Sequence, residues 1–462
     1  MMTIFKNVIK RVITVIVGIL LLVFTLIHVT YIHRGYTVLQ GFYALPKNSI
    51  DVAVVGTSIT FSAFMPMDAW HDYGISSYNY CTNVQFLNSL KYSLKDIERT
   101  QNPKVILVDI SPFVYDHIVS NPDWSADSKA LHTKYNLDSR RYSLDRFNLV
   151  DEILKDTGDE TTISDYLYYY FDIVRYHSNK INIDHFFNSE KDLNRGYQHF
   201  RHVDKPYLID INNMILKDDK TQKPNEKNIY YLKELIDVSK KSKSEVIFFC
   251  PPVYFNETKY IRQKNYICEY LENNNCICLD LCDDMDKLTM IYNMDYWNET
   301  HFDALGAEKI TKYICEYLKK NYDLPDRRKD ENYKSLNDDY EIWKGVKGEY
   351  GFLDLTSVAA DKQKGLIKDV PEVVETRIVN ARQSVATKSN ASRSKAADSK
   401  TGNTATKSEI KAEAKNSNRI NNIITTGPNY DQFNPKDQNT NKQSGNRIYS
   451  FDIAFPGPGT GE

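Results

Sequence analysis

Residues 51–61, DVAVVGTSITF, place the strongest constraint on how this chain can fold. Residues 52–55 are apolar and mostly β-branched, and they stand between an acid and a glycine. That pattern is typical of a parallel strand buried on both faces. Ser58 follows the carboxyl end of this strand, where open α/β sheets bind ligands, and Gly56 permits a sharp turn that would expose its hydroxyl. A Ser/Thr pair that only caps the next helix is the competing interpretation.

Further apolar runs alternate with amphipathic segments along the chain. We expect strands at residues 75–80, 104–110, 246–250 and 277–281, and helices at residues 67–73, 88–100, 228–241, 261–272 and 306–321. This alternation predicts an α/β fold with three layers, a parallel sheet flanked by helices, of the flavodoxin-like kind. Residues 111–224 interrupt the pattern with aromatic clusters. We interpret them as a partly helical insertion that either shapes a substrate cleft or packs as a cap.

The N-terminal 36 residues contain an apolar run at 12–31, preceded by Lys6, Lys10 and Arg11. About 20 apolar residues suffice to span a bilayer, so we predict a single transmembrane helix. The positive-inside rule places the N-terminus in the cytoplasm and residues 37–345 outside it. A cleaved signal peptide and a buried core helix are the alternatives.

Residues 346–462 form the third predicted part of the chain. After Val374 they are rich in Ala, Ser, Lys, Asn and Thr and hold almost no large apolar residues, which predicts a mostly disordered tail. The net charge of −2 gives no basic surplus, so nothing indicates nucleic acid as a partner.

Seven cysteines are present, an odd number that leaves at least one thiol unpaired within the chain. Cys276, Cys278 and Cys282 have a spacing that a zinc site could use, but no histidine is near and they alternate as strand residues do. We interpret them as buried free thiols.

His301 is the second candidate catalytic residue, because it stands in a loop just before the last predicted helix. An α/β fold would bring that loop to the sheet edge that carries Ser58. A serine hydroxyl is a poor nucleophile until a base takes its proton, and histidine suits that role near neutral pH. A histidine with a purely structural role is the alternative.

Three segments together resemble the SGNH/GDSL hydrolase superfamily. They are GTSITFSAFMPMDAWHDYGISSYN, QNPKVILVDISPF and NETHFDALGAEKITKYICEYLKKNYDLPDRR. Within it, the chain is most similar to the membrane-anchored bacterial branch of DltD-like and polysaccharide O-acyltransferase-like proteins. The resemblance spans residues 50–343 and implies that Ser58 is the nucleophile and His301 the base. The family usually has an aspartate three positions before the histidine, where this chain has Asn298.

An asparagine at this position can accept a hydrogen bond from the imidazole through its side-chain carbonyl. It carries no charge to stabilise an imidazolium, however. Asp295, Glu299 and Asp303 are the acids near enough in sequence to substitute.

The oxyanion donors of the family are also not plainly present. Asn83, together with the backbone amides of Ser58 and Thr82, is our candidate oxyanion hole. An ordinary turn residue is the alternative interpretation of Asn83.

The resemblance implies an O-acyltransferase or esterase that faces outward and modifies a cell-envelope polysaccharide or teichoic-type polymer. A polytopic membrane O-acyltransferase would supply the acyl group, and the chemistry needs no metal and no organic cofactor. A second hypothesis is a catalytically silent protein of the same fold that binds a glycan or scaffolds an envelope complex, because Asn298 replaces the expected aspartate.

Overall fold

We analysed a computed structural model of the chain, which describes residues 2–32, 38–158, 160–176, 192–200, 211–215, 217–292 and 294–349. The predicted disordered tail lies, from residue 350 onward, outside these ranges.

The core is a five-stranded parallel sheet in the order β2-β1-β3-β4-β5. Its strands are β1 (Val52–Gly56), β2 (Ser77–Cys81), β3 (Val105–Asp109), β4 (Glu245–Cys250) and β5 (Ile277–Asp280). Every residue of β1, β2 and β3 is buried, which confirms the prediction of strands covered on both faces. The order is that of flavodoxin-like doubly wound sheets.

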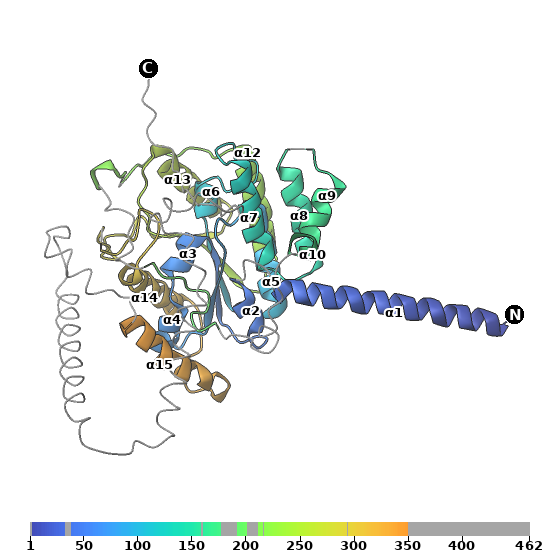
Figure 1. Cartoon of the computed structure of the whole chain (residues 1–462). Coiled ribbons are helices and arrows are strands. Elements are labelled where there is room, and N and C mark those ends of the chain that lie inside the picture. Colours follow the sequence, from blue (N-terminus) through green and yellow to red (C-terminus); the bar gives the residue numbers. More distant parts are fainter. Residues whose placement is uncertain are drawn as a thin grey trace, which may run out of the picture. The chain divides into compact units, whose positions relative to one another are not determined.

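Helices cover both faces of this sheet (Figure 1). The helices α3 (Ser58–Ala63), α4 (Pro66–Tyr73) and α14 (Ala304–Asn321) lie on one side, where α14 contacts the other two. On the other side lie α5 (Leu87–Thr100) and α12 (Glu226–Ser239), in contact with each other, and α13 (Thr258–Asn273) packs against β5. The α4 helix ends at Gly74, which adopts φ 67° as a left-handed C-cap. The three-layer α/β prediction is therefore confirmed.

The region between β3 and α12 is partly helical where it is described. It contains α6 (Ser111–Val114), α7 (Ala126–Asp138), α8 (Leu144–Asp156), α9 (Ile163–Tyr170), α10 (Asp172–Tyr176) and the 3-10 turn η2 (Ile211–Asn213). A hydrophobic cluster that includes Phe86, Leu137, Leu149 and Ile153 packs α7 and α8 against the loop before α5. No residue of α9 is buried.

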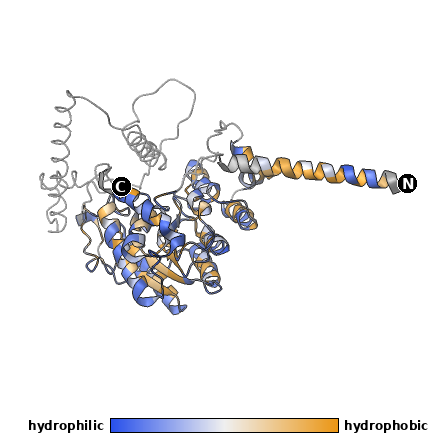
Figure 2. Cartoon of the chain, turned by 90° about the horizontal axis from the view of Figure 1, so that it is seen from below, coloured by the Kyte–Doolittle hydropathy of each residue, from blue (hydrophilic) through white to orange (hydrophobic). Residues whose placement is uncertain are grey.

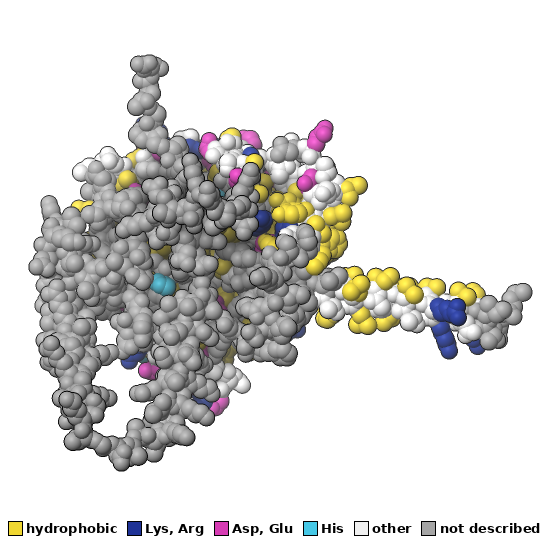
Figure 3. All heavy atoms as spheres, viewed as in Figure 1, with side chains coloured by type: hydrophobic (Ala, Val, Ile, Leu, Met, Phe, Trp, Pro, Cys, Tyr) yellow, Lys and Arg dark blue, Asp and Glu magenta, His cyan; other side chains and the backbone are white. Residues whose placement is uncertain are grey.

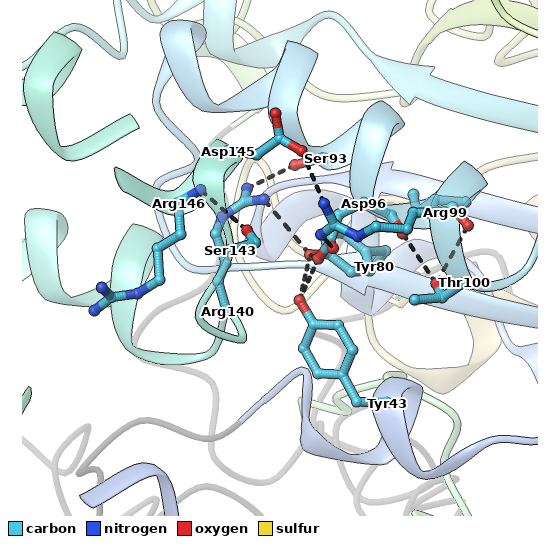
Figure 4. Close-up of polar contacts among 11 residues, drawn as sticks. Tyr43, Tyr80, Ser93, Asp96, Arg99, Thr100, Arg140, Ser143, Asp145 and Arg146 are labelled. Carbon is cyan, nitrogen blue, oxygen red and sulfur yellow. Dashed lines mark hydrogen bonds and ion pairs between the residues drawn. The ribbon is translucent and has the colours of Figure 1, made fainter. Parts of the chain in front are cut away.

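A buried polar network joins this region to the sheet and to α2 (Gln40–Ala44), as Figure 4 shows. Arg140 donates to Ser93 Oγ at 2.7 Å, and its guanidinium lies beside Tyr80 of β2. Tyr80 donates to Asp96 Oδ2 at 2.6 Å, and Tyr43 of α2 donates to the same oxygen. Burial raises the pKa of both tyrosines, so they remain donors. Since every member is satisfied by another, the network fixes how these elements pack.

The N-terminal helix α1 spans Met2–Ile32. Its stretch Phe5–Thr25 is long and apolar enough to cross a membrane, and no part of it is buried within the protein. Figure 2 shows that the helix is hydrophobic over most of its length, and Figure 3 shows Lys and Arg side chains gathered near its N-terminal end.

The last helix in the described part of the chain, α15 (Lys334–Glu349), was not identified from the sequence, and it crosses the boundary predicted at residue 345. Trp343 anchors it: the side chain is 1% exposed, and its Nε1 donates to Asp68 Oδ1 of α4 at 3.0 Å. Tyr197 packs edge-on against the same indole.

We predict that Trp343→Ala destabilises the chain by about 3 to 5 kcal/mol, because a large buried side chain is removed and a cavity remains. Trp343→Phe keeps most of the packing and loses the hydrogen bond to Asp68, so its loss should be smaller. Denaturant unfolding of the detergent-solubilised chain measures both. Equal stability of Trp343→Ala and the unaltered chain would show that α15 is not anchored as described.

Candidate active site

The candidate site lies at the carboxyl end of β1, next to β3. From β1 the chain leads to β2 on one side, and from β3 it leads to β4 on the other, so the strand order reverses between them. Doubly wound sheets bind ligands at this switch point. Thr57 caps α3 by accepting a hydrogen bond from the Ile59 amide at 3.2 Å, and Ser58 is the first residue of the helix. Ser58 is partly exposed among buried neighbours.

Ser58 Oγ lies 2.8 Å from His301 Nε2. His301 comes from the loop between β5 and α14, so the fold joins the two residues that the sequence placed at one sheet edge. Asp303, two residues later, is the N-cap of α14 and accepts from the amides of Leu305 and Gly306. The loop is thereby fixed at the start of a helix.

Asn298 determines the tautomer of His301. Its Oδ1 accepts from the backbone amides of Thr300 at 3.0 Å and of His301 at 2.8 Å. Since a backbone amide can only donate, this atom must be the oxygen. The same oxygen lies 3.0 Å from His301 Nδ1, which therefore carries the proton. Nε2 is then the unprotonated nitrogen, and it accepts the hydrogen bond from the Ser58 hydroxyl.

No carboxylate orients the imidazole in the part of the chain that the structure describes. The partners of Nδ1 are Asn298 and the Thr300 hydroxyl, at 3.1 Å. Asp295 instead accepts from the Ile291 amide at 2.7 Å and pairs with Lys309 at 2.6 Å. Burial raises the pKa of Asp295 to about 6, and Lys309 opposes that rise. The sequence-based suggestion that a neighbouring acid replaces the missing aspartate is thus not supported by Asp295 or by the capping Asp303.

Burial lowers the pKa of His301 to about 4. The imidazole is therefore neutral near pH 7, as a base must be. The same desolvation makes the protonated form costly, and Asn298 has no charge to offset that cost.

A buried acid, Asp109, stabilises the turn that carries Ser58. Asp109, at the end of β3, accepts from Thr60 Oγ1 and Ser111 Oγ, each at 2.6 Å, and from the Ser111 amide at 2.7 Å. Burial raises its pKa, and these hydrogen bonds oppose the rise. Gly56 packs tightly here: a Cβ on it would lie 2.4 Å from Thr60 Oγ1 and 2.7 Å from Asp109 Cβ. Sequence reasoning did not single out Asp109, although an acid at the end of a buried strand was a usable signal.

Aromatic side chains line one side of the pair. Phe200 stacks on Trp297 with ring centroids 4.5 Å apart, and its ring meets His301 edge-on at 5.0 Å. Phe61 of α3 stacks behind Phe200. Partly exposed aromatic faces of this kind can hold an apolar or a sugar-like group beside the serine.

One donor of the predicted oxyanion hole, the Thr82 amide, needs correction. The Thr82 amide donates to the Gly56 carbonyl at 3.1 Å, because β2 pairs with β1 up to Cys81, so this amide is not available to a substrate. Asn83 follows in the turn, where a side-chain hydrogen bond joins it to Tyr135 of α7. The Ser58 amide remains a candidate donor, because it precedes the first intrahelical donors of α3 and a helix start favours negative charge. The role of Asn83 stays a prediction.

The cysteines lie outside this site, and the structure gives all seven as free thiols. Cys250, Asp280 and Cys282 place their ligand atoms within 4.8 Å of one another. Lys264, however, pairs with Asp280 and lies 3.2 Å from Asp283, so an ammonium already neutralises the carboxylate that a metal would use. A hydrogen bond with Cys282 and burial raise the pKa of Cys250, so this thiol is protonated near pH 7.

Comparison of the chain with family models, with curated proteins and with solved structures found no match. Functional interpretation therefore rests on the geometry of Ser58, His301 and Asn298.

We predict that Gly56→Ala destabilises the chain by about 1 to 3 kcal/mol, because its methyl group would overlap Thr60 and Asp109. Gly18→Ala is the matched control, since nothing lies within 4 Å of a Cβ there. Thermal unfolding measures both. An unchanged midpoint in Gly56→Ala would contradict the close packing of the turn.

We also predict that Asn298→Asp raises the pKa of His301 from about 4 by about 1 to 3, because an adjacent negative charge stabilises the imidazolium. NMR titration of the chain with labelled histidine measures this, with His301→Gln used to assign the resonance. A pKa that does not change would show that residue 298 does not face the imidazole.

Proposed function

We propose that this chain is a membrane-anchored serine acyltransferase or esterase of the SGNH type. The observation that carries the proposal is the 2.8 Å contact between Ser58 Oγ and a His301 nitrogen whose tautomer is set by Asn298. A nucleophile, a base and an orienting group in one hydrogen-bonded chain are the geometric signature of nucleophilic catalysis.

The proposed reaction has two halves. His301 Nε2 takes the Ser58 proton while Oγ attacks the acyl carbonyl, and the Ser58 amide stabilises the oxyanion that forms. The tetrahedral intermediate collapses to an acyl-serine, and His301 gives the proton to the leaving alcohol. In the second half a sugar hydroxyl or water attacks the acyl-serine. His301 takes its proton and returns it to Ser58 Oγ, which leaves as the free serine.

The acceptor that we propose is a cell-envelope polysaccharide or a teichoic-type polymer outside the cytoplasm. Two features support it. The α1 helix is suited to hold the chain at a membrane, with Lys6, Lys10 and Arg11 on the cytoplasmic side by the positive-inside rule. The Phe200–Trp297 stack offers aromatic surface beside Ser58. A polytopic membrane O-acyltransferase is the proposed source of the acyl group, and the residues need no metal or organic cofactor for these steps.

The second candidate is a catalytically silent glycan-binding or scaffold protein, and Asn298 is the observation that favours it. In a serine protease, the same aspartate-to-asparagine change lowers turnover by about 10⁴-fold. That loss arises there from a wrong tautomer, whereas the tautomer here is the productive one. We therefore favour the enzyme.

We predict that a fluorophosphonate probe labels the detergent-solubilised full chain at Ser58. Ser58→Ala should abolish labelling, and Ser128→Ala, which removes a partly exposed serine on α7, should leave it unchanged. Asn298→Asp should label faster, because the added charge stabilises the imidazolium that forms during attack. Labelling that is absent, or that persists in Ser58→Ala, would exclude the enzyme and favour the silent protein.

A further inference from the structure

The helices α9 and α10 carry an apolar surface that the protein does not cover. Outside α1, seven large hydrophobic side chains are exposed in the described part of the chain, and four of them lie between the start of α8 and α10: Leu144, Ile163, Leu167 and Val174. Ile163 is 80% exposed and Leu144 is 75% exposed. Figure 3 shows hydrophobic side chains gathered where Figure 1 places α9 and α10. We call Ile163, Leu167 and Val174 the α9–α10 surface.

The composition of α9 resembles that of an interfacial helix. Its sequence is ISDYLYYY, with one acid, Asp165, which is engaged in the capping box of the helix with Thr162. Tyr166, Tyr168, Tyr169 and Tyr170 are partly exposed beside Leu167. Tyrosine combines an apolar ring with a polar tip, and it is enriched where membranes meet water. Isoleucine and leucine beside such a belt are typical of helices that lie in the headgroup region.

The length of the tether places a bilayer within reach of this surface. The apolar span of α1 ends at Thr25, the helix continues to Ile32, and the described body resumes at residue 38. Seven helical residues add about 10 Å, and five linking residues add at most about 18 Å. The body therefore begins within about 30 Å of the end of the span. The structure also places α10 in contact with α1.

We propose that the α9–α10 surface rests in the headgroup region of the bilayer that α1 spans. This inference requires α1 to span the membrane, but it does not depend on catalysis by Ser58. We favour a lipid surface over a peptide as the occupant, because the exposed apolar side chains are accompanied by partly exposed tyrosines and the one acid of α9 is held in its capping box.

Fluorescence quenching in the full chain tests this proposal. Leu167→Trp and the matched control Ile277→Trp, which replaces a side chain 44% exposed on β5, are each reconstituted in phosphatidylcholine nanodiscs. The discs contain lipids brominated close to the headgroup end of the acyl chain. Leu20→Trp in α1 reports the span itself. Emission is taken as the difference from the unaltered chain, which has four tryptophans of its own.

We expect at least twofold stronger quenching at position 167 than at position 277. Equal quenching at the two positions, with Leu20→Trp quenched, would overturn the α9–α10 proposal while leaving the anchor in place. Absence of quenching at position 20 would overturn both. Probe labelling of Ser58 in the same discs is unaffected by any of these outcomes, so the catalytic proposal succeeds or fails separately.

Discussion

The reversal of strand order between β1 and β3 is the constraint on which the site depends. Because both strands are parallel and buried, their carboxyl ends meet at one edge while their connections leave in opposite directions. Ser58 lies at this edge, and Asp109 supports the turn by accepting hydrogen bonds from the Thr60 and Ser111 hydroxyls. His301 lies at the same edge because the loop that carries it runs from the end of β5 to the start of α14. No single contact creates the pair; the sheet topology does.

Asn298 separates two roles that an aspartate would combine. Its oxygen accepts two backbone amides and the imidazole, so it orients His301 as an acid would. What it lacks is charge. Two unit charges about 5 Å apart interact by about 3 kcal/mol at an effective dielectric of about 20. Expressed wholly in the transition state, that is about a hundredfold in rate. For the proposed enzyme, the missing charge therefore predicts slower catalysis and not its complete loss.

The strands and the helices that flank them could be predicted because local sequence patterns encode them. Continuous apolar runs indicate buried strands, and apolar residues at helical spacing indicate the helices that pack on the sheet. The proximity of Ser58 and His301 could also be predicted, since the topology of a parallel sheet brings the ends of its strands to one edge. The remaining features depend on contacts that no local pattern encodes. The use of the Thr82 amide follows from the β1–β2 register, and α15 depends on the burial of Trp343 against Asp68. Whether an acid near His301 can orient the imidazole depends on its other contacts. Asp303 caps α14 and Asp295 pairs with Lys309.

The proposed membrane contacts would affect the proposed catalysis by fixing the orientation of the α/β body relative to the bilayer. A single helical anchor confines the body to the membrane surface and raises its effective concentration toward any acceptor held there, but it leaves the body free to turn about the tether. A second contact through α9 and α10 would remove that freedom and hold the edge that carries Ser58 at one angle to the bilayer. In the proposed enzyme such positioning would matter more, because near-attack geometry can supply rate that the uncharged Asn298 does not.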